Sequence, residues 1–192
     1  MQLLNEAIIR HGRLLGQDII KVDSFLNHRV DTRLLAAMGH ALADYFKVMS
    51  PTVVLTVESS GIALAAMTAY ALGGLPMVFA KKSVTVVQSE DMVYAPVYSF
   101  THKNQNVIRV DKRYIEKGSR VLIIDDFLAD GQAAEGMLLL CKKLEAEVVG
   151  VGIAIEKGFM RGGRRLRENG VHLKSLAVIQ SVQDGVITLQ ND

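Results

Sequence analysis

The chain has 192 residues, of which 49% are hydrophobic and 22% charged, and its formal net charge is +2 at pH 7. Such a chain is long and apolar enough for one folded domain with a sizeable core, and its small charge gives no reason to expect a nucleic-acid partner. No apolar run approaches the roughly 20 residues of a bilayer span, and we see no signal-peptide core. A single cysteine, Cys141, suits a reducing compartment. We therefore expect a soluble cytoplasmic protein without a membrane partner.

The first quarter of the chain predicts two helices separated by a short polar stretch. An apolar repeat at helical spacing predicts an amphipathic helix over residues 3–15, which Gly16 stops. An extended piece over residues 19–22 and a polar turn over residues 24–28 follow. A second helix over residues 31–46 begins with an aspartate, a residue type that favours the N-cap position.

Strands and helices then alternate, as in a parallel sheet with right-handed crossovers. The predicted elements, in order, are a strand at 53–57, a helix at 62–72, strands at 77–80, 107–110 and 120–124, a helix around 137–144, a strand at 148–155, a short helix within 158–170, and a terminal hairpin of 176–179 with 186–189. Between residues 83 and 106 the weaker pattern predicts one or two long hairpins that act as a lid.

The predicted architecture is an α/β fold with a central parallel sheet flanked by helices. We expect a single domain over residues 1–192, with a core over about residues 50–156. Segments from about 1–35 and 157–192 are expected to form a small hood over the carboxyl edge of the sheet.

The stretch from residue 120 to residue 134 carries the clearest chemical signal. A continuous apolar run, typical of a buried parallel strand, leads into Asp125 and Asp126 and then into a small-residue loop at 129–133 before a helix. Ligands of open α/β sheets bind beyond the carboxyl ends of the strands, and free amides at a helix N-terminus favour a phosphate. Because carboxylates repel a phosphate, we expect the two aspartates to accept hydrogen bonds from hydroxyls instead. Ribose 5-phosphate fits both requirements.

This stretch resembles the signature of the type I phosphoribosyltransferases, which bind phosphoribosyl pyrophosphate (PRPP). Segments 23–28, 58–63, 98–101 and 155–157 are similar to segments of the bacterial xanthine phosphoribosyltransferases, so the resemblance spans nearly the whole chain. It implies the type I phosphoribosyltransferase fold, a homodimer, and a purine-salvage reaction that joins xanthine to the ribose of PRPP, releasing pyrophosphate and forming xanthosine 5′-monophosphate.

The resemblance also implies roles for the ribose and phosphate residues. Asp125 and Asp126 would be the catalytic carboxylates, binding the 2′- and 3′-hydroxyls and stabilising a cation-like state at C1 without forming a covalent bond. The PRPP-binding set would contain Ala129, Asp130, Gly131, Gln132 and Ala133 for the 5-phosphate, and Glu58, Ser59, Ser60 and one of Lys81 and Lys82, with Lys81 as our choice, for the pyrophosphate. The corresponding pyrophosphate loop of the family often contains a non-proline cis peptide bond.

For the purine, the resemblance points to Ile20, Asn27 and Lys157. An ammonium at Lys157 donates to a purine carbonyl and rejects an exocyclic amine, which favours oxopurines over adenine. Asn27 donates and accepts, which suits the additional oxygen and N–H of xanthine. Ile20 would cover a face of the ring.

Two features concern charge at the expected PRPP site. Asp130 stands where the xanthine branch has asparagine, and an acid beside a phosphate should weaken binding unless its side chain points away or caps the helix. The highly charged pyrophosphate leaving group calls for Mg²⁺, which we expect to be held mainly by substrate oxygens and water. No histidine and cysteine cluster in the sequence offers a protein metal site.

Two alternatives remain at this point, a guanine or hypoxanthine phosphoribosyltransferase and a PRPP-sensing transcription regulator without turnover. A regulator of this fold carries an additional N-terminal DNA-binding domain, and the residues before the first core strand lack a basic winged-helix pattern. A basic cluster between residues 161 and 167, formed by Arg161, Arg164, Arg165 and Arg167, is more typical of a solvated helix face than of a nucleic-acid site. Cys141 is expected in the core rather than as a nucleophile.

Overall fold

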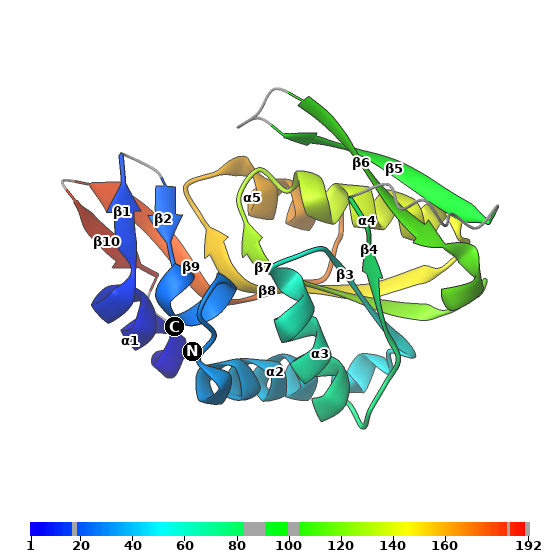
Figure 1. Cartoon of the computed structure of the whole chain (residues 1–192), viewed down its shortest axis with the longest axis horizontal. Coiled ribbons are helices and arrows are strands. Elements are labelled where there is room, and N and C mark those ends of the chain that lie inside the picture. The colour runs from blue at the N-terminus through cyan, green and yellow to red at the C-terminus, as the bar shows by residue number, and fades with distance from the viewer. Residues whose placement is uncertain (17–18, 83–90, 100–103, 184, 191–192) are drawn as a thin grey trace.

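A six-stranded sheet forms the centre of the protein in the computed structural model, which describes residues 1–16, 19–82, 91–99, 104–183 and 185–190 (Figure 1). Its order is β10 (Val186–Leu189), β9 (Leu173–Gln183), β8 (Glu147–Lys157), β7 (Arg120–Leu128), β3 (Val53–Val57) and β4 (Met77–Ala80). Every neighbouring pair from β9 to β4 is parallel, and β10 pairs with β9 in the antiparallel direction. The predicted α/β class is confirmed, with a mixed rather than wholly parallel sheet.

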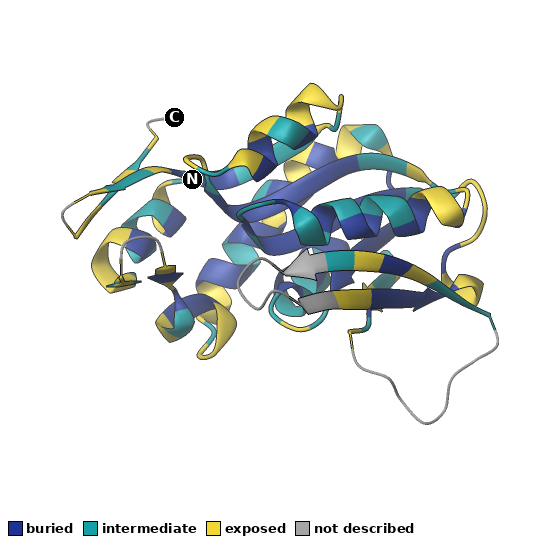
Figure 2. Cartoon of the chain, turned by 90° about the horizontal axis from the view of Figure 1, so that it is seen from above, coloured by how far each residue is buried: buried dark blue, intermediate teal, exposed yellow. Residues whose placement is uncertain are grey.

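Helices cover both faces of this sheet (Figure 1). One face carries α2 (Thr32–Phe46) and α3 (Gly61–Ala71); the other carries α4 (Gln132–Lys143) and α5 (Arg161–Glu168). Two hydrophobic clusters fill the two interfaces, and buried residues concentrate on the strands between the helices (Figure 2). Among the described helices, none combines the length and the apolar character that crossing a bilayer requires.

Local chemistry explains why several elements match their predicted bounds. All five residues of β3 are buried, as its apolar run, which only Thr56 interrupts, indicates. Asp31 caps α2, because its Oδ1 accepts hydrogen bonds from the backbone N–H groups of Arg33 and Leu34, both at 3.0 Å. Gly150 lets α2 approach β8 closely, since an added Cβ there would lie 2.3 Å from Cε1 of Phe46.

The first predicted helix was too long. Helix α1 (Gln2–His11) ends at Gly12, which is extended with φ −65° and ψ 138°. The next residues form β1 (Arg13–Leu15), which pairs antiparallel with β2 (Ile19–Lys21). Two leucines in this segment fit a helical and a strand pattern equally well, and pairing with β2 decides between the two. The predicted polar turn after β2 is a π-helical turn, η1 (Asp23–Asn27).

The N-terminal and C-terminal segments lie side by side beyond the N-terminal end of α2 (Figure 1). The amino group of Met1 donates a hydrogen bond of 2.8 Å to the carbonyl of Leu176 on β9. Side chains of α1 and η1 share one hydrophobic cluster with those of β9, including Leu4, Leu26 and Ile179. This arrangement agrees with a hood built from both ends of the chain.

The predicted strand at 107–110 does not belong to the central sheet. It is the second half of β6 (Asn104–Asp111), which forms a separate antiparallel hairpin with β5 (Met92–Ser99) over α4. Two single-turn 3₁₀ helices, η2 (Lys47–Met49) and η3 (Lys112–Tyr114), complete the described elements. The lid prediction rests largely on residues 83–90 and 100–103, which lie outside the described part of the chain.

Strand β7 is longer than predicted. It runs to Leu128 rather than ending at residue 124, because its parallel pairing with β8 continues to the pair Leu128 and Glu156. Asp125 and Asp126 therefore lie within the strand, and the loop begins three residues after them.

Candidate active site

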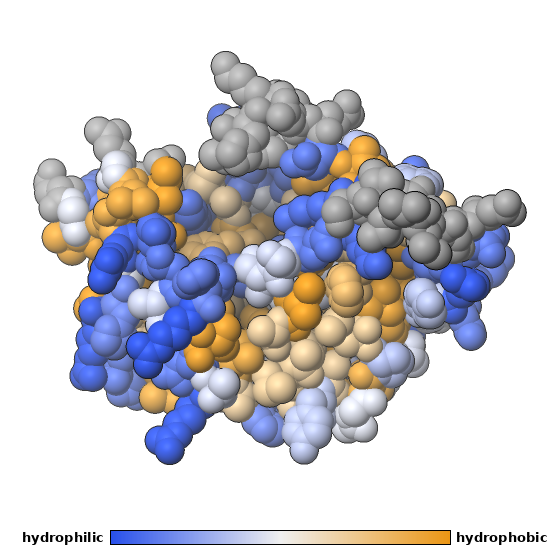
Figure 3. All heavy atoms as spheres, in the orientation of Figure 1, coloured by the Kyte–Doolittle hydropathy of each residue, from blue (hydrophilic) through white to orange (hydrophobic). Residues whose placement is uncertain are grey.

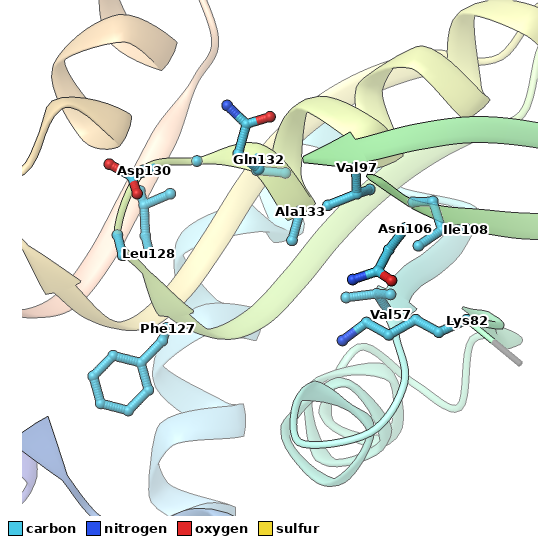
Figure 4. Close-up of a pocket in the computed structure, with 13 residues that line it drawn as sticks. Val57, Lys82, Val97, Asn106, Ile108, Phe127, Leu128, Asp130, Gln132 and Ala133 are labelled. Carbon is cyan, nitrogen blue, oxygen red and sulfur yellow. The ribbon is translucent and has the colours of Figure 1, made fainter. Parts of the chain in front are cut away.

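A cavity of about 260 Å³ lies at the carboxyl end of β7 (Figure 4). One side of it is formed by residues 127–134, which run from the end of β7 through the following loop to the start of α4. The other lining residues come from the end of β3, the segment after β4 and the β5–β6 hairpin: Val57, Lys82, Val97, Asn106 and Ile108. All five loop residues that the sequence indicated, 129–133, are among them. The cavity therefore lies where open α/β sheets place their ligands.

The 129–133 loop is shaped to present backbone amides. Gly131 is the N-cap of α4 and has φ +82°, a left-handed conformation that glycine adopts readily. The first amides of a helix have no carbonyl partner within it, so those at the start of α4 are free to bind an anion. Figure 4 shows the Asp130 and Gln132 side chains on the side of the cavity opposite Lys82.

The two aspartates of β7 are buried just before this loop. Both side chains belong to residues that are 6% exposed, and the N–H of Asp126 donates a 2.9 Å hydrogen bond to Oδ1 of Asp125. Burial, and then the negative charge of Asp126, raise the pKa of Asp125 well above its ordinary value. The pair thus resists carrying two full negative charges. Neither residue lines the 260 Å³ cavity, which Phe127 is the first residue of β7 to reach.

Asp125 lies against the start of α3. A Cβ added to Gly61 would lie 2.7 Å from Oδ1 of Asp125 and 2.4 Å from Oγ1 of Thr56, so only glycine permits this approach. The Thr56 hydroxyl is fully buried and has no hydrogen-bond partner among the described residues. The start of α3, directly after Ser59 and Ser60, therefore packs against Asp125.

The structure places the predicted pyrophosphate residues around this same loop. The peptide bond between Glu58 and Ser59 is cis, as the resemblance implied. The Oε1 atom of Glu58 accepts a hydrogen bond from the backbone N–H of Lys82. Glu58 thereby ties the end of β3 to the residues that follow β4.

Of the two lysines after β4, Lys82 rather than Lys81 lines the cavity, and its ammonium group points into it (Figure 4). Lys81 instead exchanges backbone hydrogen bonds of 2.9 and 3.0 Å with Arg109 of β6. Lys81 is not among the residues that line this cavity, and its contact with pyrophosphate stays a prediction. Sequence reasoning also missed Asn106, whose side chain lies beside Lys82, because only long-range hairpin pairing brings β6 to the cavity.

The three predicted purine residues lie in different settings. The Nδ2 atom of Asn27 is 3.5 Å from Oδ2 of Asp126, so η1 is joined to the aspartate pair. Lys157 ends β8 at the same sheet edge, next to the Glu156 that pairs with Leu128. Ile20 is 7% exposed and belongs to the hydrophobic cluster that the hood shares with α2, α3 and the central sheet.

Neither a protein metal centre nor a cysteine nucleophile is indicated in the part of the chain that the structure describes. Within it, histidine, cysteine, aspartate and glutamate side chains form no group of three or more suited to a metal ion. Cys141 is 1% exposed, and burial raises the pKa of its thiol to about 12. It packs in the cluster beneath α4, as predicted.

Comparison with known proteins points to one family. The profile of the phosphoribosyl transferase domain matches residues 30–173. The xanthine phosphoribosyltransferase of Oceanobacillus iheyensis is 45% identical over 192 residues, covering 100% of this chain and 98% of the relative. That of Clostridioides difficile is 45% identical over 187 residues, covering 97% and 98%.

Solved structures of similar fold include adenine phosphoribosyltransferases. The enzyme from Rhodothermus marinus superposes with a TM-score of 0.76 at 25% identity, covering 93% of this chain and 100% of that one. The Trypanosoma brucei enzyme, solved in complex with AMP, pyrophosphate and ribose-5-phosphate, has a TM-score of 0.77 at 18% identity, covering 94% and 81%.

Proposed function

The chain belongs to the phosphoribosyltransferase family, and we propose that it transfers the 5-phosphoribosyl group of PRPP to N9 of xanthine. The products are xanthosine 5′-monophosphate and pyrophosphate. One observation carries this proposal, a cavity lined by the amide-bearing 129–133 loop, three residues beyond a buried aspartate pair. Relatives with 45% identity over the whole chain support xanthine as the purine.

A purine panel tests the reaction. The purified protein is incubated with PRPP and Mg²⁺ together with xanthine, guanine, hypoxanthine or adenine, and nucleotide formation is followed. We expect the highest kcat/KM with xanthine and the lowest with adenine. Guanine or hypoxanthine as the best substrate would favour the related salvage enzymes, and no nucleotide with any purine would favour a PRPP-sensing regulator.

The residues divide the chemistry between two ends of the ribose. The 129–133 loop, here called the phosphate loop, binds the 5-phosphate through its amides. Asp125 and Asp126 accept hydrogen bonds from the ribose hydroxyls and stabilise positive charge as the bond to pyrophosphate breaks. Apolar lining by Val57 and Ile108 helps exclude water, which would otherwise hydrolyse the cation-like state.

The leaving group is expected to meet Lys82 and the loop at 58–60. Lys82 brings its ammonium into the cavity, and Ser59 and Ser60 bring hydroxyls and backbone amides at the start of α3. Bound Mg²⁺ would neutralise charge on the pyrophosphate. The residues present fit an ion held mainly by PRPP oxygens and water, because Mg²⁺ prefers oxygen ligands and the Asp125 and Asp126 carboxylates beside the ribose would favour a hydrated cation there.

Purine recognition falls to Asn27 and Lys157. Asn27 contacts the aspartate that holds the ribose, which suits a side chain placed beside the glycosidic bond. Lys157 donates to a purine carbonyl, so the site rejects adenine, whose exocyclic amine also donates. Ile20 contributes apolar surface from the hood.

Asp130→Asn tests whether the unusual acid in the phosphate loop weakens PRPP binding. Because the side chain lies across the cavity from Lys82 and is not needed for the loop amides, we expect the KM for PRPP to stay the same or to fall by up to about fivefold, the range for an exposed charge. Steady-state kinetics at low salt measures it. A large increase in this KM would reveal a positive role for the carboxylate.

We also propose a homodimer built on α3 and β4. Helix α3 consists almost entirely of apolar residues, and Tyr70 and Phe79 remain 74% and 37% exposed. Figure 3 shows apolar residues gathered over this part of the surface. Exposed apolar patches of this kind mark association surfaces.

Tyr70→Glu should convert the dimer to a monomer, because it places a charge in the centre of the proposed interface. Sedimentation velocity at micromolar concentration measures the change. Tyr114→Glu, at another exposed tyrosine on η3, is the matched control and should leave the dimer intact. A wild-type protein that sediments as a monomer would contradict the proposal.

The remaining proposals concern the cellular location of the protein and the alternative purine substrates. We place the enzyme in the cytoplasm, and its single, buried cysteine supports a reducing compartment. A guanine or hypoxanthine enzyme would use the same phosphate loop and aspartate pair. The identity of the relatives favours xanthine over both.

A further inference from the structure

Helix α5 lies directly against the back of the phosphate loop. The N–H of Gly162 donates a 3.1 Å hydrogen bond to the carbonyl of Ala129. A Cβ added to Gly162 would lie 2.3 Å from that carbonyl oxygen and 2.6 Å from the nitrogen of Gly131. The contact between helix and loop is therefore backbone to backbone, and it leaves no room for a side chain.

Arg165 holds the same loop with its guanidinium group. Its Nη2 atom donates a 2.7 Å hydrogen bond to the carbonyl of Asp130, and the guanidinium also forms an ion pair with Glu135 in the first turn of α4. One side chain thus joins α5 to both sides of Gly131. A planar guanidinium with several fixed donors suits such a double contact, whereas an ammonium does not.

This hydrogen bond also sets the direction of an amide. In a trans peptide the carbonyl and the following N–H point in opposite directions. Because Arg165 holds the Asp130 carbonyl, the N–H of Gly131 points away from the Arg165 guanidinium. Gly131 lines the cavity, so its amide is kept available for an anion there.

The other end of α5 is anchored just as firmly. Arg167 donates hydrogen bonds of 2.7 and 2.8 Å to the two carboxylate oxygens of Glu156, a residue of β8 that is 4% exposed. Gly163 makes this possible, since a Cβ there would lie 1.9 Å from Oε1 of Glu156. The helix is therefore fixed to the central sheet, and Arg165 extends from a rigid support.

We propose that Arg165 is a positioning residue for the phosphate loop. It holds the Asp130 carbonyl and Glu135 so that the loop amides already have the conformation that receives the 5-phosphate of PRPP. This inference rests on the proposed function. It gives Arg165 a role in the PRPP site, with Arg167 fixing its helix, in place of that of a merely solvated residue.

Arg165→Ala and Arg165→Lys test the proposal, with Arg164→Ala as the matched control. Arg164 is exposed on the same helix, so its loss removes the same charge without touching the loop. Steady-state kinetics should show a KM for PRPP raised about 10- to 100-fold in Arg165→Ala, as for loss of a charge-assisted hydrogen bond. The KM for xanthine should stay within about twofold in all three variants, and Arg165→Lys should fall between wild type and Arg165→Ala.

Three results would overturn the proposal. The first is a wild-type KM for PRPP in Arg165→Ala. The second is an equal rise of this KM in Arg164→Ala, which would indicate general electrostatic attraction. The third is an equal rise of the KM values for PRPP and for xanthine in Arg165→Ala. If Arg165→Ala does not fold, Arg165→Lys gives the same test, because an ammonium cannot make the double contact with the Asp130 carbonyl and Glu135. A wild-type KM for PRPP in a folded Arg165→Lys would then overturn the proposal.

Binding measured without turnover separates this inference from the proposed function. Calorimetric titration with ribose 5-phosphate should show weaker binding to Arg165→Ala than to wild type and Arg164→Ala. A wild-type protein that binds ribose 5-phosphate but forms no nucleotide would contradict the proposed reaction alone. A wild-type protein that does not bind ribose 5-phosphate would contradict both.

Discussion

Asp125→Asn is expected to lower kcat with xanthine and PRPP by about 100-fold or more, the range for losing one electrostatic contact to the transition state. Asparagine keeps the oxygen that accepts the hydrogen bond from the N–H of Asp126. It removes a group that can ionise as positive charge develops on the ribose, since a nearby positive charge favours the carboxylate despite the raised pKa of Asp125 in the free protein. Steady-state measurement of nucleotide formation at saturating xanthine and PRPP gives kcat.

The same substitution should stabilise the fold, and more so at higher pH. Burial and Asp126 raise the pKa of Asp125 in the folded protein, so the folded state holds this proton more tightly than the unfolded state. The stability contributed by the group is present at low pH and is lost as pH rises through the folded pKa. Asparagine cannot ionise. The gain in melting temperature over wild type should therefore grow as pH rises from the ordinary pKa of an aspartate in the unfolded chain to the raised pKa of Asp125 in the folded protein.

Asp31→Asn is the control for this experiment. It is also an aspartate-to-asparagine change, and it lies at the N-cap of α2, where asparagine caps equally well. Both kcat and the melting temperature should stay close to wild type. An unchanged kcat in Asp125→Asn, or a stability gain that shrinks as pH rises, would contradict the proposed role of the aspartate pair.

Lys157→Ala is expected to raise the KM for xanthine by about 10- to 100-fold while the KM for PRPP changes by less than about threefold. The physical reason is the loss of a charged donor to a purine carbonyl, which leaves that carbonyl unpaired in the site. The measurement is a pair of saturation curves, each substrate varied at a fixed high level of the other.

Lys117→Ala serves as the matched control for this lysine. Lys117 precedes β7, at the opposite end of that strand from the cavity, and its ammonium is 2.7 Å from Glu145 in an exposed ion pair. Its loss should change neither KM. Equal increases in the two KM values of Lys157→Ala would remove the role of Lys157 in purine recognition.

The elements that sequence predicted best are those whose burial follows from local pattern. Strands β3 and β4 have the predicted bounds, and Asp31 caps α2 as expected. Strand β7 and its following loop were recognised because an apolar run, two acids and small residues adjoin in the sequence. In each case the signal lies within about ten neighbouring residues.

The features that sequence missed depend on long-range pairing. Asn106 reaches the cavity only because β5 and β6 form a hairpin over α4. The end of β7 stays in the sheet because β8 continues beside it, although two charged residues suggested an end. Arg165 looked like a solvated residue, since nothing near it in sequence reveals the carbonyl of Asp130.

A crystal structure with bound xanthosine 5′-monophosphate tests the central claim most directly. We expect its phosphate within hydrogen-bond distance of the amides at 129–133, its ribose hydroxyls on Asp125 and Asp126, and its purine beside Asn27 and Lys157. A nucleotide whose phosphate lies elsewhere, with the 129–133 amides and both aspartates free of contact to it, would contradict the account.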